Sequence, residues 1–209
     1  MGIDSSNSVD FSEISISNLL NMKGELPFGV YIRLSDNKFT LLFKKGDTVD
    51  QERFSQYSQK GVKELFIHKS ERREYISATE VLVNKQQSEG NVLDHEHFQA
   101  IEELTEQTMF EIHEDKIFDE ASLRRAQTVI QSYIDIIKKD AKCLATFLSL
   151  SRDESYECRH GIATAVFAVL LAKADKNDND KTLMIIGLGG LLHDLGMSML
   201  TESYTDVNR

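Results

Sequence analysis

The spacing of apolar residues changes near residue 88, and this change constrains the fold of the 209-residue chain more than any other feature. Before it, short runs of β-branched and aromatic residues alternate with polar ones, which is typical of half-buried strands. After it, apolar residues recur every three or four positions, which is typical of amphipathic helices. The sequence therefore predicts a mainly α protein: a small α+β domain at residues 1–88, then an all-helical bundle at residues 89–209.

The first domain is expected to contain a β-hairpin, a short helix, a third strand and a longer helix. A turn cluster, Ser35-Asp36-Asn37, separates the two strands of the hairpin. Gly61 is expected to end the short helix. The polar stretch 85–91, which contains Gly90, marks the domain boundary. The strands are predicted at residues 28–34, 38–43 and 62–67, and the helices at 50–60 and 71–86.

The second domain reads as a succession of helices. Asp94 is a natural N-cap for the first helix, and Asp119 opens the second. The last two helices are apolar on nearly every side, so we expect them to be buried. A polar turn at residues 175–180 separates this last pair. The helices are predicted at residues 94–113, 119–139, 140–150, 155–174 and 181–194.

Composition restricts the partners and the compartment of the chain. It holds 34 acidic and 24 basic residues, a formal net charge of −10, which argues against binding to bulk nucleic acid or to an anionic membrane. No apolar run reaches the roughly 18 residues that a spanning helix needs, so we expect no membrane span. Two cysteines without a CxxC spacing fit a reducing cytoplasm, and we expect a cytoplasmic protein.

A histidine and an aspartate, His193 and Asp194, end the apolar run that reads LGGLL. Aspartate is rarely buried unless it is paired or bound to a metal. His160, on the preceding predicted helix, is the other histidine placed to reach this pair. Imidazole nitrogens together with a carboxylate oxygen suit divalent Mn, Fe or Zn. We therefore expect these three side chains to point into the bundle interior and to share a cation.

These residues carry a resemblance to a known family. His160, a gap of about thirty residues and then LLHDLG resemble the HD superfamily of metal-dependent phosphohydrolases. The segment YECRHGIATA, followed by LGGLLHDLGM, most resembles the HD-GYP branch. The resemblance implies a helical HD-type bundle behind a regulatory domain, two or three metals (often iron or manganese) and hydrolysis of cyclic di-GMP. It assigns His160, His193 and Asp194 to metal binding, with Asp194 as the bridging, catalytic carboxylate.

The sequence departs from the family pattern at three points, and these departures bear on whether the protein is catalytically active. Met197 stands where the family has lysine, and Tyr156 stands where three-metal members have glutamate. The family's downstream histidines, last aspartate and GYP loop do not follow before Arg209. We expect either a fragment of a longer protein or a domain that has lost catalysis.

The main hypothesis is a divergent, bacterial HD-GYP-type phosphodiesterase with a dinuclear Fe or Mn site in the complete domain, acting on or sensing cyclic di-GMP. The alternative is a catalytically inactive, HDOD-like signalling module that binds nucleotide or protein partners. Whether the helices form a homodimer stays open.

Overall fold

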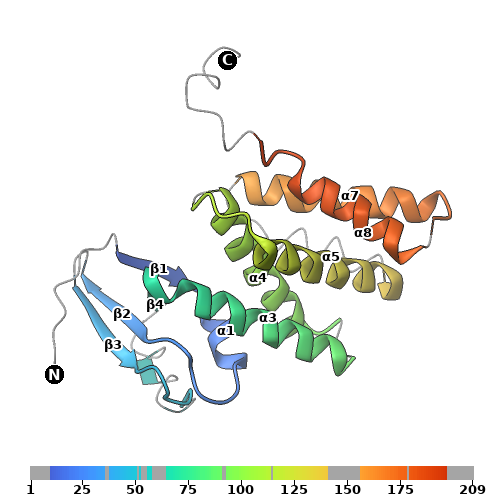
Figure 1. The fold of residues 1–209 in the computed structure, drawn as a ribbon. Coiled ribbons are helices and arrows are strands. Elements are labelled where there is room, and N and C mark those ends of the chain that lie inside the picture. The colour runs from blue at the N-terminus through green and yellow to red at the C-terminus, as the bar shows by residue number, and fades with distance from the viewer. Residues whose placement is uncertain are drawn as a thin grey trace. The chain divides into compact units, whose positions relative to one another are not determined.

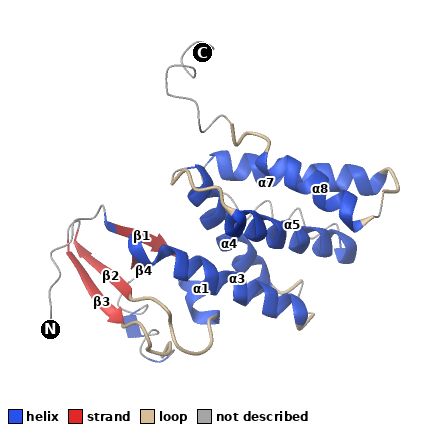
Figure 2. Cartoon of the chain, in the orientation of Figure 1, coloured by secondary structure: helices blue, strands red, loops and turns tan. Residues whose placement is uncertain are grey.

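The structure, a computed structural model, describes residues 10–35, 38–50, 52, 56–57, 65–90, 93–113, 115–140, 156–177 and 179–196. These residues are mostly helical, as predicted, and they also form one small four-stranded sheet (Figures 1 and 2). The chain forms two compact units, Met1–Lys85 and Gln86–Arg209. The first holds the sheet, and the second holds the long helices that follow it.

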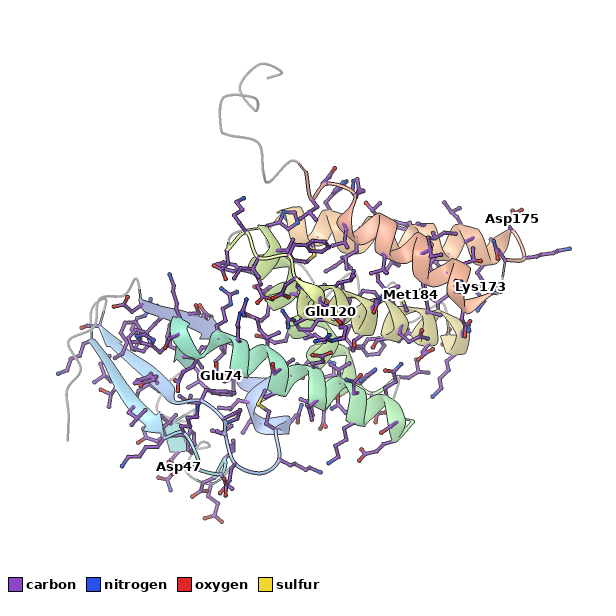
Figure 3. All side chains as sticks on the ribbon, in the orientation of Figure 1. Asp47, Glu74, Glu120, Lys173, Asp175 and Met184 are labelled. Atoms are coloured by element: carbon purple, nitrogen blue, oxygen red, sulfur yellow. The ribbon has the colours of Figure 1, made fainter. Side chains whose placement is uncertain are left out.

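The sheet of the first unit is antiparallel in every pairing, with the strand order β1-β4-β2-β3. The predicted hairpin is confirmed, since its strands pair in a register that sets Arg33 opposite Phe39. Asp47 shapes the loop after the hairpin, where its carboxylate accepts a hydrogen bond from the backbone N–H of Lys44 (Figure 3). The strands are β1 (Phe11–Ile14), β2 (Val30–Ser35), β3 (Lys38–Phe43) and β4 (Leu65–His68).

Helices α1 (Ile16–Asn21) and α3 (Arg72–Ser88) contribute to the core of this unit. Buried Asn18 joins them, because its amide donates to the Tyr75 hydroxyl at 3.0 Å and to the Thr79 hydroxyl at 2.9 Å. A short 3-10 turn, η2 (Lys69–Glu71), leads from β4 into α3. Strand β1 and helix α1 were not predicted.

Two predicted elements of this unit fall largely outside the described residues. These are the helix at residues 50–60, with its end at Gly61, and the first part of the strand at residues 62–67. Strand β4 corresponds to the end of that predicted strand. The helix predicted at residues 71–86 is confirmed as α3, which continues two residues further, to Ser88.

The second unit contains four long helices among its described residues (Figure 1). Helix α4 packs on α5 and α7 packs on α8, while α5 also contacts both α7 and α8. The predicted start at Asp119 is confirmed, because its carboxylate accepts from the backbone N–H of Ala121 and Ser122. The helix predicted at residues 140–150 lies outside the described residues. The helices are α4 (His95–His113), α5 (Glu120–Asp140), α7 (Tyr156–Ala174) and α8 (Asp180–Leu192).

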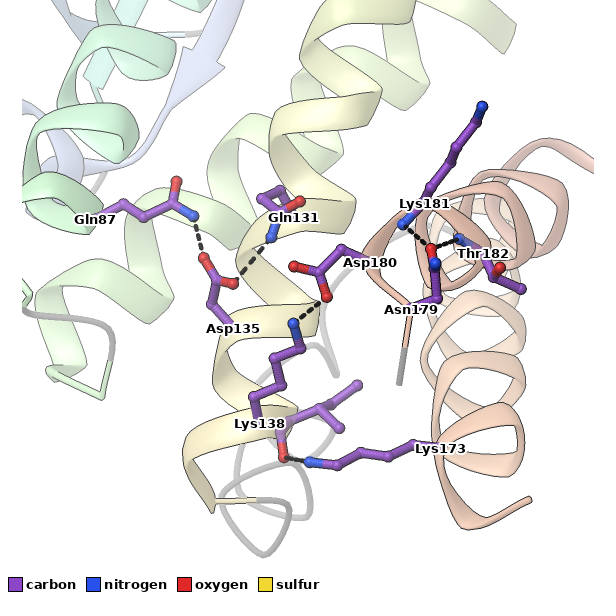
Figure 4. Close-up of polar contacts among 10 residues, drawn as sticks. Gln87, Gln131, Asp135, Lys138, Lys173, Asn179, Asp180, Lys181 and Thr182 are labelled. Carbon is purple, nitrogen blue, oxygen red and sulfur yellow. Dashed lines mark hydrogen bonds and ion pairs between the residues drawn. The ribbon is translucent and has the colours of Figure 1, made fainter. Parts of the chain in front are cut away.

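Polar contacts hold α5 to its neighbours (Figure 4). The Asp135 carboxylate accepts from the amides of Gln87 and Gln131. Lys138 pairs with Asp180, and Lys173 donates to the Ile137 carbonyl at 3.0 Å. The contact of Gln87 with Asp135 lies within the second unit, which begins at Gln86. The domain boundary predicted after residue 88 stays a prediction.

The turn between α7 and α8 confirms the predicted connection at residues 175–180, and Asp175 projects from it (Figure 3). Asn179 caps α8, because its side-chain oxygen accepts from the backbone N–H of Lys181 and Thr182. Helix α8 therefore begins one residue before the predicted start.

The expectation that α7 and α8 are buried on all sides was wrong. Each helix has large apolar side chains in solvent, with exposed fractions of 54% for Phe167, 71% for Leu171 and 62% for Ile185. Within the described part of the chain, α4 and α5 cover only one side of this helix pair. The two helices therefore carry more apolar side chains than the neighbouring helices can cover.

Candidate metal centre

The three residues singled out from the sequence come from one end of the α7–α8 pair. His160 lies in the second turn of α7, and His193 is the C-cap of α8. Asp194 follows in the turn at residues 193–196, so α8 ends at Leu192 and not at residue 194 as predicted. The N-terminal part of α7 thus meets the C-terminal end of α8.

The structure brings one ligand atom from each of these side chains to a common point. Nε2 of His160 lies 3.2 Å from Nε2 of His193. Oδ2 of Asp194 lies 3.0 Å from the His193 nitrogen and 3.3 Å from the His160 nitrogen. The three atoms therefore form a nearly equilateral triangle.

A backbone contact fixes the tautomer of His193. Its Nδ1 lies 2.9 Å from the carbonyl oxygen of Gly190, one turn earlier in α8. Because a carbonyl can only accept a hydrogen bond, Nδ1 is the donor and carries a proton. In the neutral form of this ring the lone pair would be on Nε2, which faces His160 and Asp194. Metal-binding histidines commonly use the second nitrogen in this way.

The triangle fits the ligand shell of one cation. Two ligands each about 2.1 Å from a metal and about 90–110° apart are separated by about 3.0–3.4 Å. Two imidazoles and one carboxylate suit divalent Fe, Mn or Zn. Within the described ranges, no other group of three His, Cys, Asp or Glu side chains is gathered closely enough to hold an ion.

The site is more open than the sequence predicted. The side chains of His160, His193 and Asp194 are 40%, 37% and 50% exposed, so they do not point into a bundle interior. The physical reason is their place at the ends of two helices that are covered on one side. Such a site leaves room for water or for a ligand beside the three side chains.

None of the other histidines joins this group of ligand atoms. Exposed His95 begins α4 and His113 ends it, whereas His68 caps η2 by accepting from the backbone N–H of Ser70. No role was predicted for His97, yet its side chain is fully buried. It falls four positions before Ile101 on the apolar stripe of α4, and this spacing was the signal that could have revealed its burial.

Burial changes the chemistry of His97. Removal from water lowers its pKa to about 4, although the charges of Asp94 and Asp135 oppose the shift and Lys139 adds to it. Its Nδ1 lies 3.4 Å from the side-chain oxygen of Gln86. His97 is therefore a neutral core residue near the start of α4.

Some sequence predictions about the site fall outside what the structure describes. Met197 lies beyond the described residues, and the side chains of Tyr156 and Cys158 are likewise not described. The effect of Met197 and Tyr156 on metal binding therefore stays a prediction.

Comparisons with known proteins agree with this arrangement at the level of the fold. The helical unit carries a histidine on one helix and a His-Asp pair at the end of the next. Among solved structures, the chain is similar to Bd1817, an HDG"Y"P protein from Bdellovibrio bacteriovorus, with a TM-score of 0.52 and 20% sequence identity. The match covers 90% of this chain and 60% of that one, so the chain spans 60% of the length of Bd1817.

At this level of identity the likeness shows a shared fold. No family model matches the chain, and no curated protein matches it. Within the described residues, none of the helices combines the length and the apolar character needed to cross a membrane.

Proposed function

We propose that the chain is a divergent HD-GYP-type phosphodiesterase module that binds divalent Fe or Mn and acts on or senses cyclic di-GMP. The observation that carries this proposal is the triangle formed by Nε2 of His160, Nε2 of His193 and Oδ2 of Asp194. The shared fold with an HDG"Y"P protein supports it independently of the ligand geometry.

The residues of the chain take distinct roles in this proposal. The two imidazoles would supply nitrogen ligands, and the Gly190 carbonyl orients the ring of His193 so that Nε2 faces the other two side chains. Asp194 points Oδ2 toward both imidazoles, and its carboxylate would hold the cation and take the bridging role that the resemblance implies. A bound divalent cation would neutralise charge on a phosphodiester and lower the pKa of a coordinated water.

The half-exposed position of the three side chains suits a bulky phosphodiester. A substrate of this kind needs access to the ligand atoms from solvent, and a site closed on all sides would exclude it. The net charge of −10 is compatible with an anionic substrate, because metal ions dominate the local field of such a site.

The first experiment measures metal content and metal binding. Protein purified without chelators should contain Fe, Mn or Zn by elemental analysis, and the metal-free protein should take up added Mn²⁺ or Fe²⁺. Asp194→Asn should lose this binding, whereas His95→Ala, which changes an exposed histidine outside the site, should retain it. Wild-type protein that binds neither added metal would overturn the proposal.

The second experiment measures turnover of cyclic di-GMP with added Mn²⁺, or with Fe²⁺ under anaerobic conditions. Hydrolysis by wild type that is lost in Asp194→Asn would establish the phosphodiesterase. Metal binding without turnover, together with measurable nucleotide binding, would replace it with the sensing role.

One observation favours the inactive, HDOD-like signalling module as a second candidate. Among the described residues the three candidate ligand atoms gather around one point, which suits a single cation. This candidate predicts neither turnover nor a two-to-one ratio of metal to protein. It would be rejected by hydrolysis that depends on Asp194.

A further inference from the structure

Helices α7 and α8 approach each other closely at Gly190, beside the candidate metal centre. A Cβ atom built on Gly190 would lie 2.6 Å from Cα of Ala165 and 2.8 Å from its backbone nitrogen. These are backbone atoms of α7, so no side-chain rotation can remove the overlap. Any residue larger than glycine at this position must push the two helices apart.

Gly190 also contacts a candidate ligand directly. Its carbonyl oxygen accepts from Nδ1 of His193 at 2.9 Å. Across the same helix contact, Nε2 of His160 on α7 lies 3.2 Å from Nε2 of His193 at the end of α8. Gly190 therefore combines a close approach to the backbone of α7 with the contact that orients one imidazole.

We propose that Gly190 is a positioning residue for the metal centre. By lacking a side chain it sets the separation of α7 and α8 that brings the imidazoles of His160 and His193 together, and its carbonyl selects the tautomer of His193. The inference rests on the proposed function in one respect, since it takes these imidazoles to be metal ligands.

The neighbouring glycines provide internal controls. A Cβ on Gly189, in the same helical turn, would meet nothing within 4 Å. A Cβ on Gly187 would lie 2.6 Å from a methyl group of Ile130, which is on α5. A Cβ on Gly161 would lie 3.0 Å from the Leu191 carbonyl oxygen, a milder overlap on the α7–α8 contact. These positions separate the effect of spacing from effects of helix propensity and general packing.

The test compares the Mn²⁺ affinity of Gly190→Ala with that of Gly189→Ala and wild type, using the full chain and titration calorimetry. Changes to groups that orient metal ligands typically cost about 10- to 100-fold in affinity, and we expect a loss of this size for Gly190→Ala. Gly189→Ala should bind as wild type does. Gly161→Ala should show a smaller loss in the same direction, and it replaces Gly190→Ala if that variant does not fold.

The variant Gly187→Ala distinguishes a general loss of helix packing from a specific loss of ligand positioning. This variant should lower the melting temperature through its overlap with Ile130, yet it should bind Mn²⁺ more tightly than Gly190→Ala does. Equal losses of affinity in both variants would overturn the assignment to Gly190. Wild-type affinity in a folded Gly190→Ala protein would overturn it as well.

A metal-free measurement distinguishes failure of this inference from failure of the proposed function. The ¹⁵N chemical shifts of the neutral His193 ring report which nitrogen carries the proton. Wild type should show the proton on Nδ1, and Gly190→Ala should show a changed or mixed tautomer. If wild type binds no metal, the proposed function fails while this measurement still tests positioning. An unchanged tautomer in Gly190→Ala would count against the role of Gly190 whether or not metal binds.

Discussion

Nε2 of His160 and Nε2 of His193 lie 3.2 Å apart, although the two residues are separated by 33 positions in the sequence. Two tilted imidazoles beside a carboxylate, at the end of a helix pair, have little to contribute to an apolar core. The cation proposed above, shared by all three side chains, would account for this arrangement.

Loss of either imidazole should reduce metal binding without unfolding the protein. Both side chains are more than a third exposed, so His160→Ala and His193→Ala should change the free energy of unfolding by no more than about 0.5 kcal/mol. Each should bind Mn²⁺ at least tenfold more weakly than wild type in calorimetry. His95→Ala is the matched control, and a variant of either ligand with full affinity would exclude that residue from the site.

Metal should stabilise the folded chain by mass action. At a free metal concentration of about 100 times Kd, binding to the native state alone adds about 2.7 kcal/mol to the free energy of unfolding. Urea denaturation with Mn²⁺ and with excess chelator measures this difference directly. The same comparison in Asp194→Ala should show no metal-dependent change, and an equal change in that variant would mean that the ion binds elsewhere.

Acid should weaken the fold through His97 before most carboxylates titrate. The pKa of His97 is lowered to about 4 by burial, from an ordinary value near 6.5, so the unfolded state binds the additional proton between these two values. The free energy of unfolding contributed by His97 is therefore complete above about pH 6.5 and falls by about 1.4 kcal/mol per pH unit toward pH 4.

Urea denaturation at pH 7, 6 and 5 tests this dependence. His97→Gln, which removes the titrating ring, should lose less stability than wild type over the same range. Parallel pH profiles for the two proteins would show that the burial of His97 does not control the response.

The buried ion pair between Glu111 on α4 and Arg125 on α5 should be sensitive to removal of one partner. Their side chains are 3% and 7% exposed, so Arg125→Met leaves a buried carboxylate and should cost about 3–5 kcal/mol in denaturant unfolding. Combining it with Glu111→Leu should recover part of that loss.

The adjacent arginine provides the control for this prediction. Arg124 pairs with Glu120 in solvent, four residues away on the same helix, and Arg124→Ala should cost about 0.3–0.5 kcal/mol. A loss of similar size for Arg124→Ala and Arg125→Met would contradict the importance of burial.

Periodicity was enough to predict the elements with strong, repeated apolar spacing. The bounds of β3, the start of α5 at Asp119 and the turn before α8 follow from local residues alone. Strand β1 and helix α1 were missed because they are short, and their stability comes from pairing with β4 and from the contacts of Asn18 with α3. Those partners lie more than fifty residues away in the sequence.

The identity of the candidate ligands came from the resemblance and from the position of His193 and Asp194 after an apolar run. Their mutual distances could not be predicted, because these depend on how closely α7 and α8 pack at Gly190. Their exposure was predicted wrongly for a related reason. Apolar spacing shows which faces of a helix could be covered, but it does not show whether a neighbouring helix is there to cover them.

The half-exposed position of the three side chains has an evolutionary consequence. Since none of them supports the core, selection for folding alone would let His160, His193 and Asp194 drift to other residues. A single substitution could therefore end any chemistry at this centre and leave the architecture of the two helices intact.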